Sequence, residues 1–429
     1  MSSGTENAKQ KFMGGVEKTR AAVDDASKKN SLNSQPTSGG DNPKAGGSSF
    51  RSIAKGDTVS SNYDPSKEDT VPCHAPQRPS EHMVERKVAS TKMQLTNLVL
   101  LAAAGIAPSV NAAATLRFSC SQLVVERLDP LVNPGENPSP HLHQVVGGNA
   151  FNVSMDPNVH DLPSTATCTS CTPVEDFSNY WTAVLFFKAR NGTLHRVNTF
   201  GNELGFTGAK GGQTVYYLSS GKVTAFKPGF RMTVGDPTIR TAEELNRRYK
   251  YMDFTCLASP MTRGGQTTYF PKQPCAAGIM VSIRFPTCWD GKNLDSPDHQ
   301  SHVAYPNGNA CPSTHPVAIP QVFYETYWDT RPFNNKAEWP ADGSQPFVWS
   351  FGDKTGYGIH GDYVFGWKGD ALQRAMDANC NSDLFANRIN CPTLKTQSLD
   401  EANKCTKPRT VTENLDGWLQ ELPGGMPIN

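Results

Sequence analysis

The sequence predicts a mainly β, disulfide-bonded fold, a β-sandwich or jelly roll with long ordered loops and a few short helices. Three observations predict it: short β-branched and aromatic runs between turn residues, ten cysteines after residue 112, and an export signal at residues 93–112. Many short strands with few helices favour antiparallel layers, because a parallel α/β sheet requires helices of about 10 to 15 residues between strands.

The strands are predicted from apolar runs that Gly, Pro or Asn residues bound. These runs are residues 181–187, 214–218, 230–234, 278–285, 321–328, 347–351 and 362–367. Two helices are expected, at residues 241–251 and 370–379. The connections at residues 129–151 and 287–320 exceed ordinary loop lengths. Ordered loops of this length are usually functional or held by disulfides.

Residues 1–92 are predicted to be disordered, because their only aromatic residues are Phe12, Phe50 and Tyr63. Such a segment has too little apolar surface to offset the entropy that ordering the backbone would cost. A disordered extension of this kind precedes the predicted folded domain.

Residues 93–112, which follow the basic residue Lys92, have the layout of a secretory signal peptide. An apolar stretch at residues 98–107 is followed by a small-residue cleavage site. The apolar stretch is too short for a bilayer core of about 30 Å. A buried core helix is the alternative interpretation. We expect cleavage after Ala112 and translation from Met93, which makes residues 1–92 an artefact of the gene model. The exported protein is then a single β-rich domain, residues 113–429, with a loop-rich C-terminal end.

An even number of cysteines follows the cleavage site and suits five disulfides in an oxidising compartment, each contributing about 2 to 4 kcal/mol. They are Cys120, Cys168, Cys171, Cys256, Cys275, Cys288, Cys311, Cys380, Cys391 and Cys405. The Cys-x-x-Cys at residues 168–171 has an alternative interpretation: instead of joining separate disulfides, its two cysteines could form half of a zinc site or a redox pair. Asn152-Val-Ser and Asn191-Gly-Thr are N-glycosylation sequons, so the exported protein is expected to be a glycoprotein.

The distribution of charged and apolar residues argues against two classes of partner, nucleic acids and membranes. Lys and Arg number 41 against 40 Asp and Glu, and no basic stripe predicts nucleic-acid binding. After signal cleavage, no apolar stretch of about 20 residues would anchor the chain in a membrane.

The first polar cluster is His141-Leu-His143, followed by Gly147, Gly148 and Asn149. In an extended chain residues i and i+2 point to the same side, so both imidazoles can converge on a divalent metal ion or an anionic ligand. Asn149 is a candidate substrate-binding residue. Loop histidines bonded to backbone carbonyls are the alternative.

The second cluster lies between Cys288 and Cys311. It contains Trp289, Asp290, Lys292, Asn293, Asp295, Asp298, His299, His302 and Tyr305. An aromatic residue beside acid, base and cationic groups suits a sugar site, where the aromatic ring stacks on the sugar. The spacing fits no EF-hand calcium loop. A polar loop held by the two cysteines is the alternative.

The third cluster, residues 351–363, places glycines beside Tyr357, His360 and Asp362. The glycines let the backbone approach a ligand closely, and the three side chains are candidate proton-transfer groups. A tight hairpin with a hydrogen-bonded His360 is the alternative. The motifs of phosphate-binding loops, dinucleotide folds and serine-hydrolase elbows are absent from the sequence.

Seven motifs in order resemble the DUF1996 family of exported fungal proteins, which carry a domain of unknown function and sometimes occur beside WSC or other carbohydrate-binding modules. The motifs are residues 128–135, 141–151, 176–181, 288–293, 298–306, 311–316 and 358–363. The resemblance runs from about Leu116 to Cys380, and Pro140 departs from the residue expected before the first histidine. It implies an extracellular or cell-wall setting and no particular activity.

We therefore expect a secreted carbohydrate-active protein, a hydrolase or lyase that acts on a cell-wall or plant polysaccharide. In a lyase, His360 or Tyr357 would remove a proton while Lys292 or Arg284 neutralises the uronate carboxylate. In a hydrolase, Asp290 and Asp362 would form the acid/base pair. The further candidates are His302 as a catalytic residue and Trp289, Tyr305 and Asn149 as substrate-binding residues.

Two rival functions remain open at this point. The first is a non-catalytic glycan-binding or cell-wall protein, and the second is a metal-binding protein that uses His141 and His143. The arrangement of the three clusters in the fold discriminates between one shared site and separate structural roles.

Overall fold

The computed structural model describes residues 113–156, 158, 161–260, 262–383 and 388–429. The predicted export signal and residues 1–92 lie outside these ranges. Across the described part of the chain, strands dominate and the helices are short. The predicted fold class, mainly β with disulfides, is confirmed.

The largest sheet has nine strands and is antiparallel except where β1 meets β19. Its order is β11 (Thr262–Thr267), β10 (Met252–Ser259), β12 (Ile279–Arg284), β16 (Gln321–Trp328), β8 (Gln213–Leu218), β1 (Thr115–Cys120), β19 (Asn381–Asp383) and β20 (Arg388–Asn390), with β7 (Thr199–Phe200) paired to β16. The predicted runs at 214–218, 278–285 and 321–328 form β8, β12 and β16.

The second sheet has five antiparallel strands and carries the polar residues of interest. Its order is β2 (Gln122–Glu126), β3 (His143–Gly147), β4 (Asn179–Ala183), β18 (His360–Val364) and β9 (Arg231–Gly235). Two smaller sheets complete the fold. They are β17 (Phe347–Trp349), β5 (Leu185–Lys188), β6 (Leu194–Arg196) and β21 (Trp418–Leu419), and β14 (Val303–Ala304), β13 (Cys288–Trp289) and β15 (Val317–Ala318).

The predicted strand at residues 181–187 is divided between two sheets. Its first part belongs to β4 and its second part to β5. The break falls at Val184, whose backbone N–H donates to the Leu142 carbonyl and whose carbonyl accepts from Ser350. Because both backbone groups of Val184 bond to other segments, this residue belongs to neither β4 nor β5.

The two larger sheets pack face to face. Tyr180 of β4 lies edge-on to Tyr324 of β16 at 5.7 Å between ring centroids, and Phe285 contacts Tyr363 of β18. Because side chains alternate across a strand, Trp181 and Asp362 point to the opposite, outer face of the five-stranded sheet. The loop after β3 covers that face and packs Phe151 on Trp181, with 5.4 Å between the ring centroids.

The helices lie in the connections between strands. They are α2 (Leu162–Thr165), α3 (Ala242–Arg248), α4 (Ala371–Asp377) and α5 (Leu399–Ala402), with single 3-10 turns η1 (Arg331–Phe333), η2 (Lys336–Glu338) and η3 (Pro423–Gly425). Thr241 caps α3, since its hydroxyl accepts from the backbone N–H of Glu244. Both predicted helices exist and end earlier than expected. Of the helices described, none is long and apolar enough to cross a membrane.

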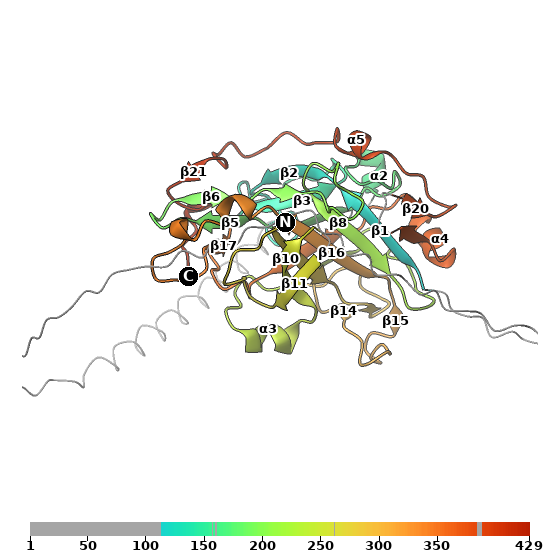
Figure 1. The fold of residues 1–429 in the computed structure, drawn as a ribbon. Coiled ribbons are helices and arrows are strands. Elements are labelled where there is room, and N and C mark those ends of the chain that lie inside the picture. The colour runs from blue at the N-terminus through green and yellow to red at the C-terminus, as the bar shows by residue number, and fades with distance from the viewer. Residues whose placement is uncertain (1–112, 157, 159–160, 261, 384–387) are drawn as a thin grey trace, which may run out of the picture. The chain divides into compact units, whose positions relative to one another are not determined.

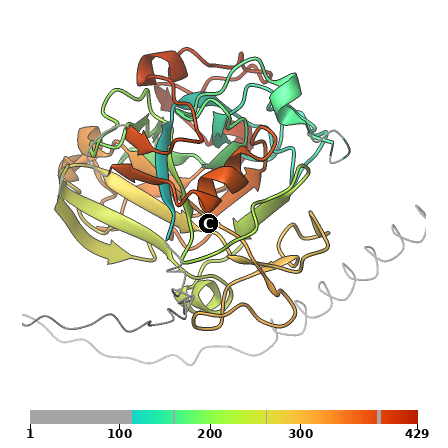
Figure 2. The same ribbon diagram turned by 90° about the vertical axis from the view of Figure 1, so that its right-hand side faces the viewer.

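Five disulfides pair all ten cysteines that follow residue 112. The pairs are Cys120–Cys171, Cys168–Cys405, Cys256–Cys275, Cys288–Cys311 and Cys380–Cys391. Because Cys168 and Cys171 have different partners, the Cys-x-x-Cys is neither a zinc half-site nor a redox pair in this structure. After β20 the C-terminal segment runs past α5 to β21, across the top of the molecule in Figure 1 and beside the N-terminal strands in Figure 2.

Candidate functional site: three histidines on the outer face of the five-stranded sheet

Three histidines from two of the polar clusters meet beside the five-stranded sheet. Nε2 of His141 lies 3.2 Å from Nε2 of His360, and the rings of His141 and His143 are 4.3 Å apart between centroids. One nitrogen from each histidine can be chosen so that all three atoms lie within 4.8 Å of one another. All three residues are buried: His143 has no exposed surface, and His141 and His360 keep 9% and 6% exposure.

The segment that carries His141 and His143 is fixed by its backbone. The carbonyl of Leu142, between them, accepts from the N–H of Val184 at 3.1 Å and from the hydroxyl of Ser350 at 2.7 Å. Both imidazoles therefore point to the same side, as the alternation of an extended chain requires.

His360 is placed by the tight turn that precedes β18. The carboxylate of Asp353 accepts from the backbone N–H groups of Thr355, Gly356 and Gly358 at 2.7 to 3.1 Å. Gly356 has a φ of 92°, a conformation that favours glycine. The turn places His360 at the first position of β18. The centroid of its ring lies 5.0 Å from that of Phe351.

The tautomers follow from the backbone partners. Nδ1 of His143 donates to the Leu128 carbonyl at 3.0 Å, and Nδ1 of His360 donates to the Gly358 carbonyl at 3.0 Å. Each of these rings therefore has its lone pair on Nε2, and His141 donates its Nε2–H to His360. Nε2 of His143 is buried without a hydrogen-bond partner.

Burial also keeps the three rings neutral. It lowers the pKa of His143 to about 4 and the pKa of His360 to about 4, where the neighbouring His143 lowers it further. For His141, burial and then its two histidine neighbours hold the pKa well below its usual value. Neutral imidazoles are the form that binds metal ions, and the lone pair on Nε2 of His143 is free to do so.

Two buried carboxyl groups adjoin the histidines. Oδ2 of Asp129 lies 4.0 Å from Nε2 of His143, while its Oδ1 accepts from the N–H groups of Leu131 and Val132. Burial raises the pKa of Asp129, while the hydrogen bonds from the backbone of Val132 and Leu131 and, to a smaller extent, the nearby His299 lower it in part. For Asp362, burial and then the charge of Asp129 raise the pKa well above its usual value.

Some buried polar atoms on the outer face of the five-stranded sheet have no hydrogen-bond partner. Oδ2 of Asp362 and Nε1 of Trp181 are buried without a hydrogen bond, as is Nε2 of His143. Asp362 and Trp181 are directly opposite each other in the β18–β4 ladder. Buried polar groups are rarely left unpaired in proteins. Nε2 of His143 is the one of these three atoms that belongs to the histidine cluster, so a ligand held there would give it a partner.

Most of the second cluster lies away from the three histidines. The carboxylate of Asp290 accepts from the backbone of Lys292 and Asn293 in its own turn, and those bonds lower its pKa. His302 is buried against Phe230 and bonded to Ser296 at 2.8 Å. Only His299, half-buried and 2.7 Å from Asp295, comes close enough to influence Asp129.

The two carboxyl groups of the predicted hydrolase pair lie on different strands and in different environments. Asp362 lies in the middle of β18 and is buried, whereas Asp290 follows β13 and accepts hydrogen bonds from its own turn. Trp289 is 4% exposed and donates its Nε1–H to the Asn293 carbonyl, so its face is not available for stacking on a sugar. Lys292 is exposed in the same turn.

The remaining predicted residues lie outside the histidine cluster. The guanidinium of Arg284 covers Phe323 at 4.2 Å, and the hydroxyl of Tyr305 donates to the Arg284 carbonyl. Tyr357 is partly exposed beside Tyr269, and burial raises its pKa. Asn149 fixes the loop after β3 through bonds to Thr167. The sequon residues Asn152 and Asn191 are both exposed.

Asp129, Asp353 and Phe351 are the residues of this site to which sequence reasoning assigned no role. Asp129 stands in the motif at residues 128–135, which carried part of the family resemblance, and Asp353 and Phe351 belong to the glycine-rich third cluster. Their roles depend on which strands become neighbours, which the local pattern does not reveal.

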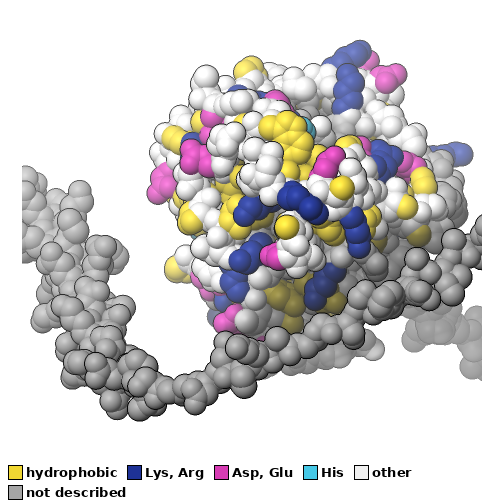
Figure 3. Space-filling model, turned by 60° about the vertical axis from the view of Figure 1, so that its left-hand side comes forward, with side chains coloured by type: hydrophobic (Ala, Val, Ile, Leu, Met, Phe, Trp, Pro, Cys, Tyr) yellow, Lys and Arg dark blue, Asp and Glu magenta, His cyan; other side chains and the backbone are white. Residues whose placement is uncertain are grey.

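The surface shown in Figure 3 mixes its charges. Lysine and arginine side chains spread over much of this face, with acidic and apolar side chains between them. The picture agrees with the nearly equal numbers of basic and acidic residues in the chain.

Comparisons with known proteins give one family and no further relative. No curated protein and no solved structure matches the chain. A family model matches residues 129–367, a range that contains the three histidines, Asp129 and Asp362. Because this match covers more than half of the 429 residues, the chain belongs to the family described as Domain of unknown function (DUF1996).

Proposed function

We propose that this protein is a metal-dependent extracellular enzyme that acts on a glycan, with its centre at His141, His143 and His360. The observation that carries the proposal is that three imidazoles each offer a nitrogen within 4.8 Å of the other two. It combines two of the sequence hypotheses, since the predicted metal ligands and a predicted catalytic histidine share one site.

The donor set suits a divalent transition metal. Imidazole binds zinc, copper, iron and nickel well. In metal sites the second ring nitrogen of a histidine usually donates to a carbonyl or carboxylate, which fixes the tautomer and the orientation of the ring. His143 and His360 already have such carbonyl partners. A metal ion would also give Nε2 of His143 a partner.

Three protein ligands are typical of catalytic metal centres. Structural zinc sites have four protein ligands, whereas catalytic sites have three and keep a position for water or substrate. A metal ion held here would supply Lewis acidity. Asp129 is the carboxylate best placed to accept a proton, because one of its oxygens faces His143 and the other is bound to the backbone.

The substrate class rests on the setting of the domain. Five disulfides suit an oxidising, extracellular environment. The predicted export signal and the two sequons point the same way, and wall or plant polysaccharides are the abundant substrates of that environment for an exported fungal-type protein. Glycan binding without catalysis remains the rival function that the activity assay below tests.

The metal proposal is tested by titration of chelator-treated protein with Co²⁺, followed by visible absorption, and with Zn²⁺, followed by calorimetry. We expect one equivalent to bind. His143→Gln is expected to weaken binding by about 100-fold or more, since loss of an outer-sphere partner alone costs about 10- to 100-fold. His315→Gln is the matched control, because His315 lies in the loop before β15 and bonds to the Ser301 carbonyl.

Urea unfolding of each variant establishes that it is folded before the titration is interpreted. Equal affinity of the wild type and His143→Gln, with both proteins folded, would refute the metal centre. So would the failure of the wild type to bind either ion.

The catalytic part is tested by assays of polysaccharides for new reducing ends and for unsaturated products. We expect turnover by metal-loaded protein and none after chelation. Asp129→Asn should retain the metal and lower the rate by about 100-fold or more, because general bases contribute about 10²- to 10⁴-fold. Its amide oxygen can still accept from Leu131 and Val132. Undiminished activity after chelation would instead support a metal-free acid/base mechanism.

A further inference from the structure

One tryptophan differs from the other six in its exposure. Trp418 of β21 is 52% exposed, whereas the remaining six tryptophans are buried. It stands opposite His195 in the β21–β6 ladder, with 5.1 Å between the ring centroids, and also contacts Phe187 at 6.3 Å. The indole is thus held by aromatic neighbours and still presents surface to solvent.

Trp418 borders two hollows of the surface. One, of about 480 Å³, is lined by Arg190, Asn191, Thr193, Glu338 and Trp418, together with two alanines. The other, of about 280 Å³, lies on the side of His195, Arg196, Asp329 and Glu338. Charged and polar side chains therefore surround an exposed indole.

The first and third residues of a glycosylation sequon, Asn191 and Thr193, line the larger hollow. Asn191 occupies the exposed turn between β5 and β6. Its Oδ1 accepts from both the backbone N–H and the hydroxyl of Thr193, at 3.1 and 2.7 Å. These bonds hold the carbonyl side of the amide and leave Nδ2 as the group that a glycan would join.

We propose that Asn191 carries an N-linked glycan whose first N-acetylglucosamine stacks on Trp418. The transferase of the export pathway would join Nδ2 of Asn191 to C1 of the sugar, and the lipid diphosphate leaves that carbon as the amide loses a proton. The proposal is independent of the metal centre and of any substrate of the protein.

The chemistry of the hollow suits this occupant. The axial C–H groups of a pyranose form an apolar face that packs on an aromatic ring, and the hydroxyl and acetamido groups need polar partners. Arg190 and Glu338 lie on the same hollow as the indole. The sugar would cover an exposed aromatic surface and would remain covalently next to it, so its local concentration is high.

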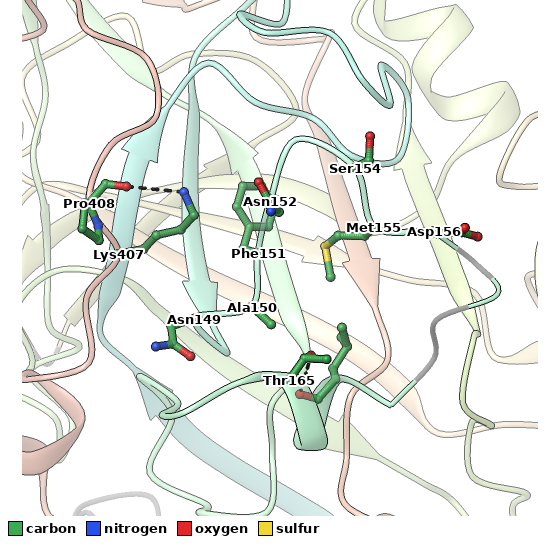
Figure 4. Close-up of a pocket in the computed structure, with 11 residues that line it drawn as sticks. Asn149, Ala150, Phe151, Asn152, Ser154, Met155, Asp156, Thr165, Lys407 and Pro408 are labelled. Atoms are coloured by element: carbon green, nitrogen blue, oxygen red, sulfur yellow. Dashed lines mark hydrogen bonds between the residues drawn. The ribbon is translucent and has the colours of Figure 1, made fainter.

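The second sequon lies in a different environment. Asn152 lines a hollow of about 630 Å³ with Asn149, Phe151 and Lys407, as Figure 4 shows. The aromatic ring there, Phe151, is only 1% exposed and packs on Trp181. Asn152 therefore provides a matched control, a sequon whose hollow is lined by no tryptophan.

Fluorescence quenching gives a direct test. The full chain is expressed in a secretory yeast host, and glycosylation of Asn191 is established by peptide mass spectrometry. Acrylamide quenching is then compared before and after peptide N-glycosidase. We expect a quenchable component of the tryptophan emission to appear only after deglycosylation. An endo-β-N-acetylglucosaminidase, which leaves the first sugar in place, should not produce it.

Variants assign the signal to the two residues. Asn191→Gln should show the quenchable component without any treatment, whereas Asn152→Gln should behave as the wild type. Trp418→Phe should lack the component under every condition. An unmodified Asn191, or quenching that deglycosylation does not change, would overturn the proposal. Protection that appears only on addition of free oligosaccharide would also overturn it, in favour of a site for external glycans.

Discussion

Gly147→Ala is expected to destabilise the protein by more than about 4 kcal/mol, which is exceptional for one added methyl group. Gly147 ends β3 with a φ of 110°, and a Cβ atom built on it would lie 1.8 Å from the Ser178 carbonyl oxygen. Both backbone groups of Gly147 are also bound to Ser170, at 2.9 Å each. The strand that carries His143 therefore cannot shift to relieve the overlap without loss of these bonds.

Gly343→Ala is the matched control for Gly147→Ala. Gly343 also has a positive φ, 79°, but nothing lies within 4 Å of the position that its Cβ would take. Its replacement is expected to cost about 1 to 2 kcal/mol from backbone strain alone. Urea unfolding at one pH compares the two variants. Equal losses of unfolding free energy would show that the β3–β4 region relaxes easily and that the close approach is unimportant.

Asp176→Asn is expected to change how stability depends on pH. Burial raises the pKa of Asp176 to about 7, even though hydrogen bonds from Tyr180 and Ser178 lower it. Between about pH 4 and pH 7 the folded state then binds more protons than the unfolded state, so the contribution of Asp176 to stability is lost as pH rises. A shift of about three units corresponds to about 4 kcal/mol between pH 4 and pH 8.

Urea unfolding at pH 4 and pH 8 measures this effect. The unfolding free energy of the wild type should fall over this interval by about 4 kcal/mol more than that of Asp176→Asn. Asp342→Asn controls for removal of a carboxylate, because Asp342 is fully exposed and its pKa is lowered by Ser344. Parallel pH curves for the wild type and Asp176→Asn would contradict a raised pKa at this residue.

The sequence predicted elements well wherever the signal is local. The run at residues 321–328 coincides with β16, and the convergence of His141 and His143 follows from the two-residue alternation of an extended chain. The meeting of these two rings with His360 could not be predicted in this way. It requires that β4 pair with both β3 and β18, which are more than 200 residues apart in the chain.

Proximity in sequence was misleading at the second cluster. Asp290 and Trp289 resemble a sugar site because an acid adjoins an aromatic residue. In the structure the carboxylate is used by its own turn and the indole by the Asn293 carbonyl. Conversely, the local sequence around Trp418 predicts no site. Its exposed indole is notable only because the fold places it beside the turn that contains Asn191, which lies far away in sequence.

The C-terminal segment supplies strands to the sheets of the domain. We therefore expect that the range matched by the family model does not fold as an independent fragment. A fragment limited to residues 129–367 would lack β1 and β2, which precede the match, and β19, β20 and β21, which follow it. It would separate Cys168 and Cys171 from Cys405 and Cys120, and would expose the edges of β3 and β8. Recombinant boundaries for this protein and its relatives should therefore extend through both flanks.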